Sequence, residues 1–241
     1  ILLIFEYVFH SKFTSPVLVY LVYFNSKKAK LQHIILLFLL AKSIILDYNK
    51  NDMVYDRFQQ EAIEYINQGY SVIVSAPTGA GKTAIAEHVI SKCLEDKIGV
   101  IYTAPLKALS NQKFRDFTVN FADNIGILTG DVSLNANAPV LIMTTEIFRN
   151  KIMDDSKSLE QYSWIIFDEI HYIDNPERGT VWEESLIFLP KHIKILGLSA
   201  TIPNIRQFAS WIESIHKKEI KVVVEEKRPV PLHFLYQCQN Q

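Results

Sequence analysis

A series of short apolar runs, rich in β-branched residues and separated by polar segments, is the feature that most constrains the fold. The runs cover residues 71–75, 99–103, 140–144, 164–167, 194–198 and 220–224. They lack the polar alternation of a strand with one wet face, which is typical of strands buried on both faces of a parallel sheet. We therefore expect a parallel sheet with helices on both sides.

Helical periodicity fills several of the intervening segments. Apolar residues recur at helical spacing after Thr83, less cleanly after Lys107, and again after Asn204, which we expect to cap its helix. A strand and helix alternation of this length predicts a doubly wound α/β domain whose ligands bind at the carboxyl ends of the strands.

A glycine-rich segment, Ala76-Pro-Thr-Gly-Ala-Gly-Lys-Thr83, follows the first of these runs. Gly79 and Gly81 allow a tight turn whose N–H groups point inward, and the following helix presents its positive end to an anion. Lys82 would reach the β- and γ-phosphates of ATP, and the Thr83 hydroxyl would bind Mg²⁺. The expected nucleotide-binding residues are Pro77, Thr78, Gly79, Ala80, Gly81, Lys82 and Thr83.

A second polar motif, Asp168-Glu-Ile-His171, follows the run at 164–167. Asp168 would hold the magnesium through water, and Glu169 would orient or deprotonate the water that attacks the γ-phosphate. A lone histidine is more often a packing residue than a catalyst, but beside this motif we expect His171 to couple the nucleotide site to a neighbouring element. The expected catalytic residues are Glu169, Asp168 and Lys82.

Charge and cysteine content narrow the class of protein. Residues 1–50 hold six lysines against Glu6 and Asp47, so residues 51–241 are acidic although the chain's formal net charge is only −1. An acidic body argues against nucleic-acid binding through a broad basic face and favours a local groove. Cys93 and Cys238 have no metal-like or disulfide-framework spacing, which favours a reducing compartment.

Residues 1–52 differ in composition from the rest. Their apolar stretches are broken by charges before they reach the roughly 18 apolar residues of a membrane span. The chain starts at Ile1, and Met53 precedes the first segment of ordinary composition. We therefore expect a mistranslated or truncated leader, with a targeting or membrane segment as the alternative.

Taken together, these motifs resemble the first RecA-like domain of superfamily 2 DExH-box helicases of the superkiller type, including cyanobacterial and chloroplast relatives. The similarity runs from about Tyr55 to Phe234. It implies a RecA-like P-loop domain at residues 53–227, followed at 228–241 by the exit toward a second RecA-like domain. The segment Phe58-Gln-Gln-Glu-Ala62 resembles the family's adenine-reading segment, in which Gln59 would bond the base.

The resemblance also assigns the nucleic-acid groove. The segments 103–112, 128–131 and 144–149 resemble motifs that touch the nucleic-acid backbone, which small hydroxyls and helix N-termini can do without a basic face. The implied contact residues are Pro105, Lys107, Thr129, Gly130, Thr145 and Arg149. Ser199 and Thr201, in a segment that links hydrolysis to strand movement, join His171 as coupling residues. Arg178-Gly-Thr-Val-Trp-Glu-Glu184 resembles a signature of this branch, with Trp182 either in the core or in contact.

The resemblance implies an ATP- and Mg²⁺-dependent helicase that moves along single-stranded RNA through sequence-independent backbone contacts. An RNA-processing or decay complex is the partner that we expect, and we expect no membrane partner. A DNA-translocating relative and a binding-only fragment without turnover remain alternatives. We expect the chain alone to bind ATP weakly and to hydrolyse it poorly, because a second domain would supply transition-state arginines. A cytoplasmic or organellar location, plastid-like included, would fit.

Overall fold

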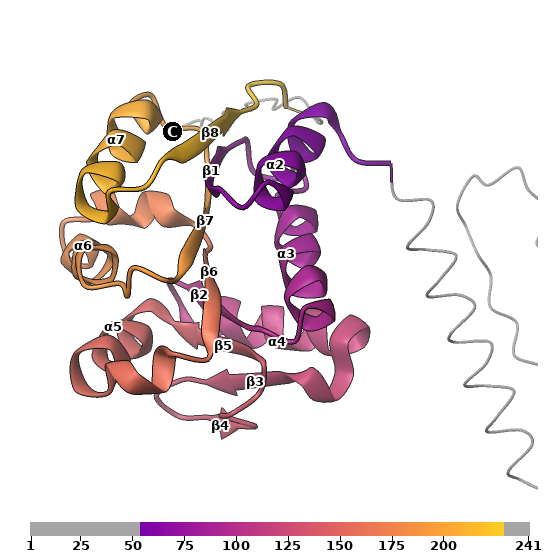
Figure 1. Cartoon of the computed structure of the whole chain (residues 1–241), viewed down its shortest axis with the longest axis vertical. Helices are drawn as coiled ribbons and strands as arrows, with labels where there is room; N and C mark the ends of the chain where they lie inside the picture. Colours follow the sequence, from indigo (N-terminus) through magenta and orange to yellow (C-terminus); the bar gives the residue numbers. More distant parts are fainter. Residues whose placement is uncertain (1–53, 229–241) are drawn as a thin grey trace, which may run out of the picture. The chain divides into compact units, whose positions relative to one another are not determined.

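The computed structural model describes residues 54–228, which form one mostly parallel sheet with helices on both faces (Figure 1). The strand order is β4-β3-β5-β2-β6-β7-β1-β8, and only β4 runs antiparallel to its neighbour. The strands are β1 (Ser71–Ser75), β2 (Gly99–Ala104), β3 (Ile125–Leu128), β4 (Ser133–Leu134), β5 (Val140–Thr144), β6 (Tyr162–Phe167), β7 (Lys194–Ser199) and β8 (Ile220–Val224). This is the α/β architecture that the sequence predicts.

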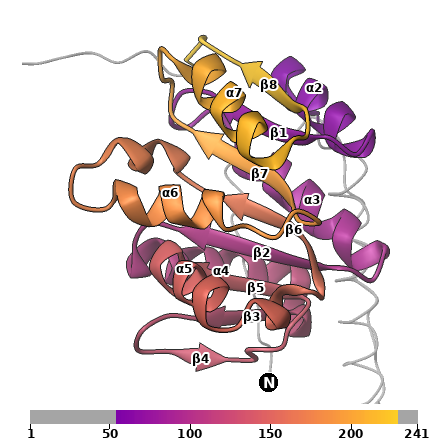
Figure 2. The same ribbon diagram turned by 60° about the vertical axis from the view of Figure 1, so that its left-hand side comes forward.

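Two helical layers cover the sheet, and the turned view in Figure 2 separates the helices of the second layer. The first layer comprises α2 (Arg57–Asn67), α3 (Thr83–Glu95) and α4 (Lys107–Phe121). The second comprises α5 (Thr145–Asp154), α6 (Gly179–Ile187) and α7 (Ile205–His216). Short 3₁₀ turns lie at η1 (Ala122–Asn124), η2 (Ser156–Leu159) and η3 (Ile170–Asp174).

The core divides between the two faces because successive strand residues point to opposite sides. In β2, for example, Val100 and Tyr102 pack in the cluster beneath α2, α3 and α4, whereas Ile101 packs beneath α5, α6 and α7. Both faces of the sheet are therefore dry. This burial on both sides is why the strands read as continuous apolar runs in the sequence.

The expected elements agree closely with the observed ones. β1, β5 and β8 have the expected bounds, and β2, β6 and β7 extend by one or two residues. β3 and β4 were not expected, because β3 is a four-residue strand interrupted by Gly126 and β4 has two exposed residues. Asn204 stands at the N-cap position of α7 but makes no side-chain capping bond, so the expected capping bond is wrong.

The N-terminal segment 1–52 and residues 229–241 lie outside the described residues, so the expectations placed on them stay predictions. Within residues 54–228, no helix is both long and apolar enough to cross a membrane.

Candidate nucleotide and nucleic-acid site

The glycine-rich loop connects β1 to the first turn of α3, at the carboxyl edge of the sheet. Gly79 and Gly81 have φ of +85° and +84°, a region that side chains with a Cβ rarely adopt. A Cβ on Gly79 would meet nothing within 4 Å, whereas one on Gly81 would lie 2.7 Å from Nε2 of Gln59. Space is therefore open at Gly79, and Gln59 packs tightly against Gly81.

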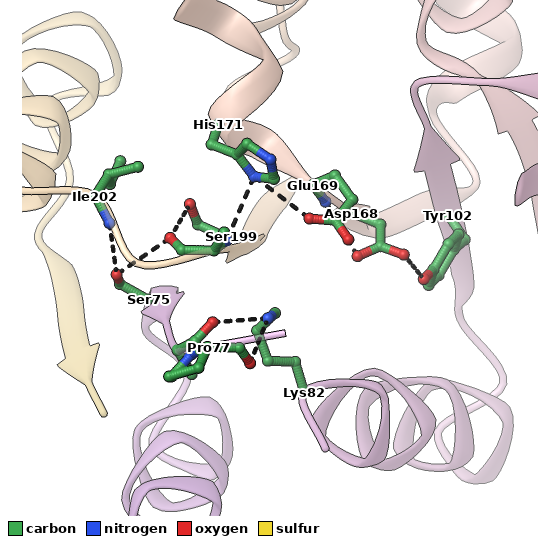
Figure 3. A network of polar contacts seen from close by, with 11 residues as sticks. Ser75, Pro77, Lys82, Tyr102, Asp168, Glu169, His171, Ser199 and Ile202 are labelled. Carbon is green, nitrogen blue, oxygen red and sulfur yellow. Dashed lines mark hydrogen bonds and ion pairs between the residues drawn. The ribbon is translucent and has the colours of Figure 1, made fainter. Parts of the chain in front are cut away.

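Lys82 folds back onto this loop. Its Nζ donates to the carbonyl oxygens of Ala76 and Pro77 at 2.7 and 3.2 Å (Figure 3). Burial lowers the pKa of Lys82, and the nearby carboxylates of Glu169 and Asp168 oppose that shift. The lysine, the loop and both acidic residues therefore share one electrostatic environment, as the two motifs predict.

Gln59 connects the N-cap of α2 to the phosphate loop through the two ends of its amide. Oε1 accepts from the backbone N–H of Asp56 at 2.8 Å, and Nε2 donates to the carbonyl of Gly81 at 2.9 Å. The residue is only 6% exposed. The sequence suggested a contact with adenine, which stays a prediction, and the structure adds a contact with the phosphate loop that sequence reasoning missed.

Asp168 emerges from the end of β6 with both carboxylate oxygens engaged. Oδ1 accepts from the N–H of Glu169 at 3.0 Å, and Oδ2 accepts from the hydroxyl of Tyr102 (Figure 3). Burial and the neighbouring Asp168 carboxylate raise the pKa of Tyr102 well above its ordinary value, so its hydroxyl stays a donor. Tyr102 was missed, although a tyrosine inside a doubly buried strand signals that its hydroxyl has a partner.

Glu169 has a left-handed backbone, with φ of +53° and ψ of 43°. A non-glycine residue in this conformation costs on the order of 1–2 kcal/mol, and such strain gathers at functional sites. Its Oε2 lies 3.3 Å from Nδ1 of His171. The turn that follows β6 thus holds the expected general base in a constrained position beside the histidine.

His171 also contacts the residue that directly follows β7, the neighbour of β6 on the side of β1. The backbone N–H of Ala200 lies 3.3 Å from Nδ1 of His171. A backbone N–H can only donate, so this bond requires an unprotonated Nδ1. A proton on Nδ1 would instead favour the Glu169 carboxylate. His171 therefore stands between Glu169 and the Ser199-Ala-Thr201 segment, which is the location that a coupling residue requires.

The end of β7 is tied to the start of the phosphate loop. The N–H of Ala76 donates to the carbonyl of Ser199 at 3.1 Å. The hydroxyl of Ser199 donates to the carbonyl of Ala200 at 2.7 Å, and Ser75 contacts the same carbonyl at 3.4 Å. Thr201, by contrast, is exposed. Ser199 and Thr201 were the other two expected coupling residues. Ser199 is thus part of the link between β7 and the phosphate loop, whereas Thr201 is exposed to solvent.

A second lysine reaches the site from α4. Nζ of Lys113 donates to Oγ1 of Thr83 at 2.9 Å. Thr83 is the first residue of α3 and the expected Mg²⁺ ligand, so a cation already contacts the oxygen that would bind the metal. Lys113 was missed because it comes directly after the segment 103–112, in which only Pro105 and Lys107 were singled out.

The expected nucleic-acid residues cluster at the same edge of the sheet, beyond β6 from the phosphate loop. Pro105, Thr129 and Thr145 follow β2, β3 and β5 and are buried. Gly130 is exposed, and Lys107 is exposed in an ion pair with Asp131. Arg149 is half-buried and its Nε lies 2.5 Å from Glu184. Lys107 and Arg149, the two cations expected to contact nucleic-acid phosphates, are therefore each paired with a carboxylate.

The Arg178–Glu184 signature contributes mainly to packing. Trp182 is 2% exposed and its ring centroid lies 5.8 Å from that of Phe167. Truncating it to alanine would cost on the order of 3–5 kcal/mol of folding free energy. Arg178 donates to the carbonyl of Pro105 at 3.3 Å, so the signature also fixes the start of the expected nucleic-acid segment.

The family profile described as "DEAD/DEAH box helicase" matches residues 56–208, which include the phosphate loop, Asp168, Glu169 and Ser199. The chain belongs to the DEAD/DEAH box helicase family. This membership agrees with the helicase resemblance of the sequence motifs. The likeness to cyanobacterial and chloroplast members stays a prediction.

Several similar proteins are RNA helicases of the superkiller and Mtr4 type. The chain is 50% identical over 182 residues to "Superkiller complex protein 2" of Mus musculus, covering 75% of this chain and 14% of that protein. It is 48% identical over 184 residues to "Exosome RNA helicase MTR4" of Homo sapiens, covering 76% and 18%. It is 50% identical over 182 residues to "mRNA transport homolog 4" of Caenorhabditis elegans, covering 75% and 18%. The helicase domain described here thus spans less than a fifth of these relatives.

Solved structures confirm the fold of this helicase domain. The Mycobacterium smegmatis helicase Lhr bound to single-stranded DNA and AMP-PNP superposes with a TM-score of 0.62 at 24% identity, covering 74% of this chain and 27% of that one. The DUF1998 helicase MrfA bound to DNA and AMPPNP gives 0.61 at 19% identity, covering 73% and 28%. At these identities the likeness speaks for the architecture alone.

Proposed function

We propose that this domain binds and hydrolyses ATP in an ATP-dependent RNA helicase, and that hydrolysis drives translocation along single-stranded RNA and unwinding. One observation carries the proposal. The turn after β6 places Asp168 and Glu169 between the phosphate loop and the strands that bear the expected nucleic-acid residues, and His171 in that turn contacts the Ser199-Ala-Thr201 segment. The groups proposed for ATP hydrolysis and the histidine proposed to couple hydrolysis to strand movement therefore lie in the same turn.

ATP would bind with its phosphates in the loop at residues 77–83. Lys82 would exchange its two carbonyl contacts for the β- and γ-phosphates, which are stronger acceptors for an ammonium group. Glu169 would accept a proton from the attacking water, held in place by its constrained backbone. The general base then faces Lys82 across the site.

The Thr83 hydroxyl and the Asp168 carboxylate are of the chemical types that bind magnesium. Hydroxyl and carboxylate oxygens are the ligands that Mg²⁺ prefers, and it retains waters and substrate phosphates in its shell. Thr83 already accepts a hydrogen bond from a cation, and the Asp168 carboxylate is fixed by two donors. Thr83 and Asp168 would therefore hold the ion. When bound, it would neutralise charge on the phosphates.

RNA is the proposed single strand because the relatives with 48–50% identity include an exosome RNA helicase, an ATP-dependent RNA helicase and a superkiller complex protein. By the same likeness, we propose that the full protein works in an RNA-processing or decay complex.

We also propose a reducing compartment, cytoplasmic or organellar. Cys93 fits there as a free thiol whose burial raises its pKa to about 12.

The test is ATP hydrolysis by the full-length protein that carries this domain, measured with single-stranded RNA, with single-stranded DNA of the same sequence, and without nucleic acid. We expect RNA to stimulate hydrolysis more than DNA. Stronger stimulation by DNA would favour a DNA-translocating protein. Absence of hydrolysis with retained ATP binding would favour a binding-only protein.

Two substitutions assign the roles within the site. Lys82→Ala should abolish ATP binding, whereas Glu169→Gln should preserve binding and stop turnover, because it removes the base without removing a phosphate contact. Hydrolysis that survives Glu169→Gln would assign the base to another group. Glu160→Gln, an exposed glutamate outside the site, is the matched control and should change neither property.

A further inference from the structure

Lys113 is an unassigned cation at the nucleotide site. It projects from the middle of α4, is half-buried, and donates from Nζ to Oγ1 of Thr83 at 2.9 Å. Its ammonium lies 5.8 Å from the ring centroid of Phe117, one turn further along α4, which is within cation–π range. The ammonium group of Lys113 is thus positioned by two contacts, one with the Phe117 ring and one with the Thr83 hydroxyl.

This hydroxyl is the oxygen on which the proposed magnesium site depends. A threonine hydroxyl offers two lone pairs and one proton. A divalent ion bound to that oxygen would repel an ammonium group at hydrogen-bond distance from the same oxygen, and the repulsion is strong in a partly buried site. The Lys113–Thr83 bond and direct magnesium binding by Thr83 therefore oppose each other.

The structure offers Lys113 a second partner. Glu87 lies four residues after Thr83 on α3, so both side chains lie on the same face of that helix. Because Lys113 contacts Thr83, its ammonium group lies beside the face of α3 that carries Glu87. In keeping with this, burial raises the pKa of Glu87 and the charge of Lys113 opposes that shift. Glu87 is half-buried, and a carboxylate there gains from an approaching ammonium group.

We propose that Lys113 is a positioning residue of the magnesium site: it holds the Thr83 hydroxyl while the metal is absent and moves toward Glu87 when Mg²⁺ and nucleotide bind. The inference rests on the proposed ATP-binding function. Its consequence is that Lys113 sets the magnesium concentration at which nucleotide binds, because the ion must displace the ammonium group from Thr83.

The test is a magnesium titration of nucleotide binding by the 241-residue chain, followed by the fluorescence of an N-methylanthraniloyl derivative of ATP. Lys113→Met removes the charge and keeps an unbranched stem over Phe117. We expect it to lower the half-saturating Mg²⁺ concentration by about threefold to tenfold, as loss of one repelling charge predicts. Glu87→Gln should raise that concentration, because Lys113 loses its second partner. A damaged fold cannot tighten magnesium binding, so the downward shift separates the proposed role from a structural one.

Two controls complete the experiment. Lys113→Arg keeps the charge, and Lys92→Met removes an equal charge from the last turn of α3, where Lys92 contacts Asn67. Both should leave the half-saturating Mg²⁺ concentration unchanged. Normal nucleotide binding by the wild type with an unshifted or raised value for Lys113→Met would overturn this inference alone. A wild-type chain that binds nucleotide independently of magnesium would likewise overturn this inference alone, whereas a wild-type chain that binds no nucleotide would overturn the proposed function and this inference with it.

Discussion

The hydroxyl of Tyr102, buried in β2, donates a hydrogen bond to Oδ2 of Asp168 at the end of β6. The same ring packs edge-on against Phe117 of α4, with centroids 5.3 Å apart. The Asp168 carboxylate is therefore oriented from inside the sheet as well as by the N–H of Glu169 in the turn after β6. In the proposed function this carboxylate would hold magnesium, and a group that orients such a carboxylate is part of the site because it fixes the direction of the lone pairs.

Tyr102→Phe should reduce the RNA-stimulated kcat of the full-length protein by about tenfold or more, the usual consequence of removing a partner of a metal-binding group. The change deletes one oxygen and leaves the ring packing intact, so the melting temperature should barely move. Steady-state ATPase assays and thermal denaturation measure the two quantities. Tyr162→Phe is the control, since that buried hydroxyl contacts Ala138 away from the site. Equal kcat values for the two variants would remove Tyr102 from the site.

Asp131→Asn should strengthen RNA binding. Lys107 is paired with Asp131, and both side chains are more than half exposed, so the pair itself contributes little to stability. Removing the carboxylate frees Lys107 to contact an RNA phosphate. It also removes a negative charge that would repel the RNA. We expect Kd for single-stranded RNA to fall by about twofold to fivefold at low salt and by less at high salt, because salt screens exposed charges.

Fluorescence anisotropy with labelled RNA measures this change. Asp123→Asn is the matched control, because Asp123 is an exposed aspartate in η1, at the opposite end of β3. It should leave Kd unchanged. Weaker RNA binding by Asp131→Asn would show that Asp131 orients Lys107 for the RNA instead of competing with it.

His171→Ala should uncouple RNA binding from hydrolysis. The substitution removes the contacts with Glu169 and with the N–H of Ala200 but leaves the phosphate loop untouched. We expect basal ATPase to persist while the ratio of RNA-stimulated to basal rate falls by about fivefold or more, the range of a typical coupling free energy. His192→Ala, at an exposed histidine before β7, serves as the control. An unchanged ratio in His171→Ala would leave the histidine with a packing role.

The strands and the phosphate loop could be predicted well from the sequence, because both depend on residue types within a short segment of the chain. A strand buried on both faces must be apolar throughout, and a phosphate loop needs glycine where φ is positive, as at Gly79 and Gly81. β4 escaped prediction because its two exposed residues carry no such pattern. Local signals therefore sufficed for the scaffold and for the centre of the site.

The contacts between elements were not predictable in the same way. Tyr102 meets Asp168 across 66 positions of sequence, and Lys113 meets Thr83 across 30. Such pairs depend on the order of strands in the sheet, which places β2 beside β6, and on the rotation of α4 over it. No periodicity encodes these features. For the same reason the ion pairs that hold Lys107 and Arg149 became visible only in the structure.

Gln59→Glu should weaken the binding of adenine and guanine nucleotides alike. The glutamate side chain can still accept from the N–H of Asp56 but can no longer donate to the carbonyl of Gly81, which Nε2 of Gln59 contacts at 2.9 Å. It also sets a carboxylate against that carbonyl and near the phosphates. Loss of a buried hydrogen bond with an unsatisfied acceptor predicts about a tenfold rise in Kd for ADP and for GDP.

Isothermal titration of both nucleotides tests this prediction, with Gln60→Glu as the control. Gln60 is the neighbouring exposed residue, and its amide donates to the carbonyl of Tyr55 outside the loop. A loss confined to ADP would show that Gln59 acts mainly by reading the base. A shared loss would show that it acts mainly by bracing Gly81, because that contact is blind to the base and serves every nucleotide whose phosphates enter the loop.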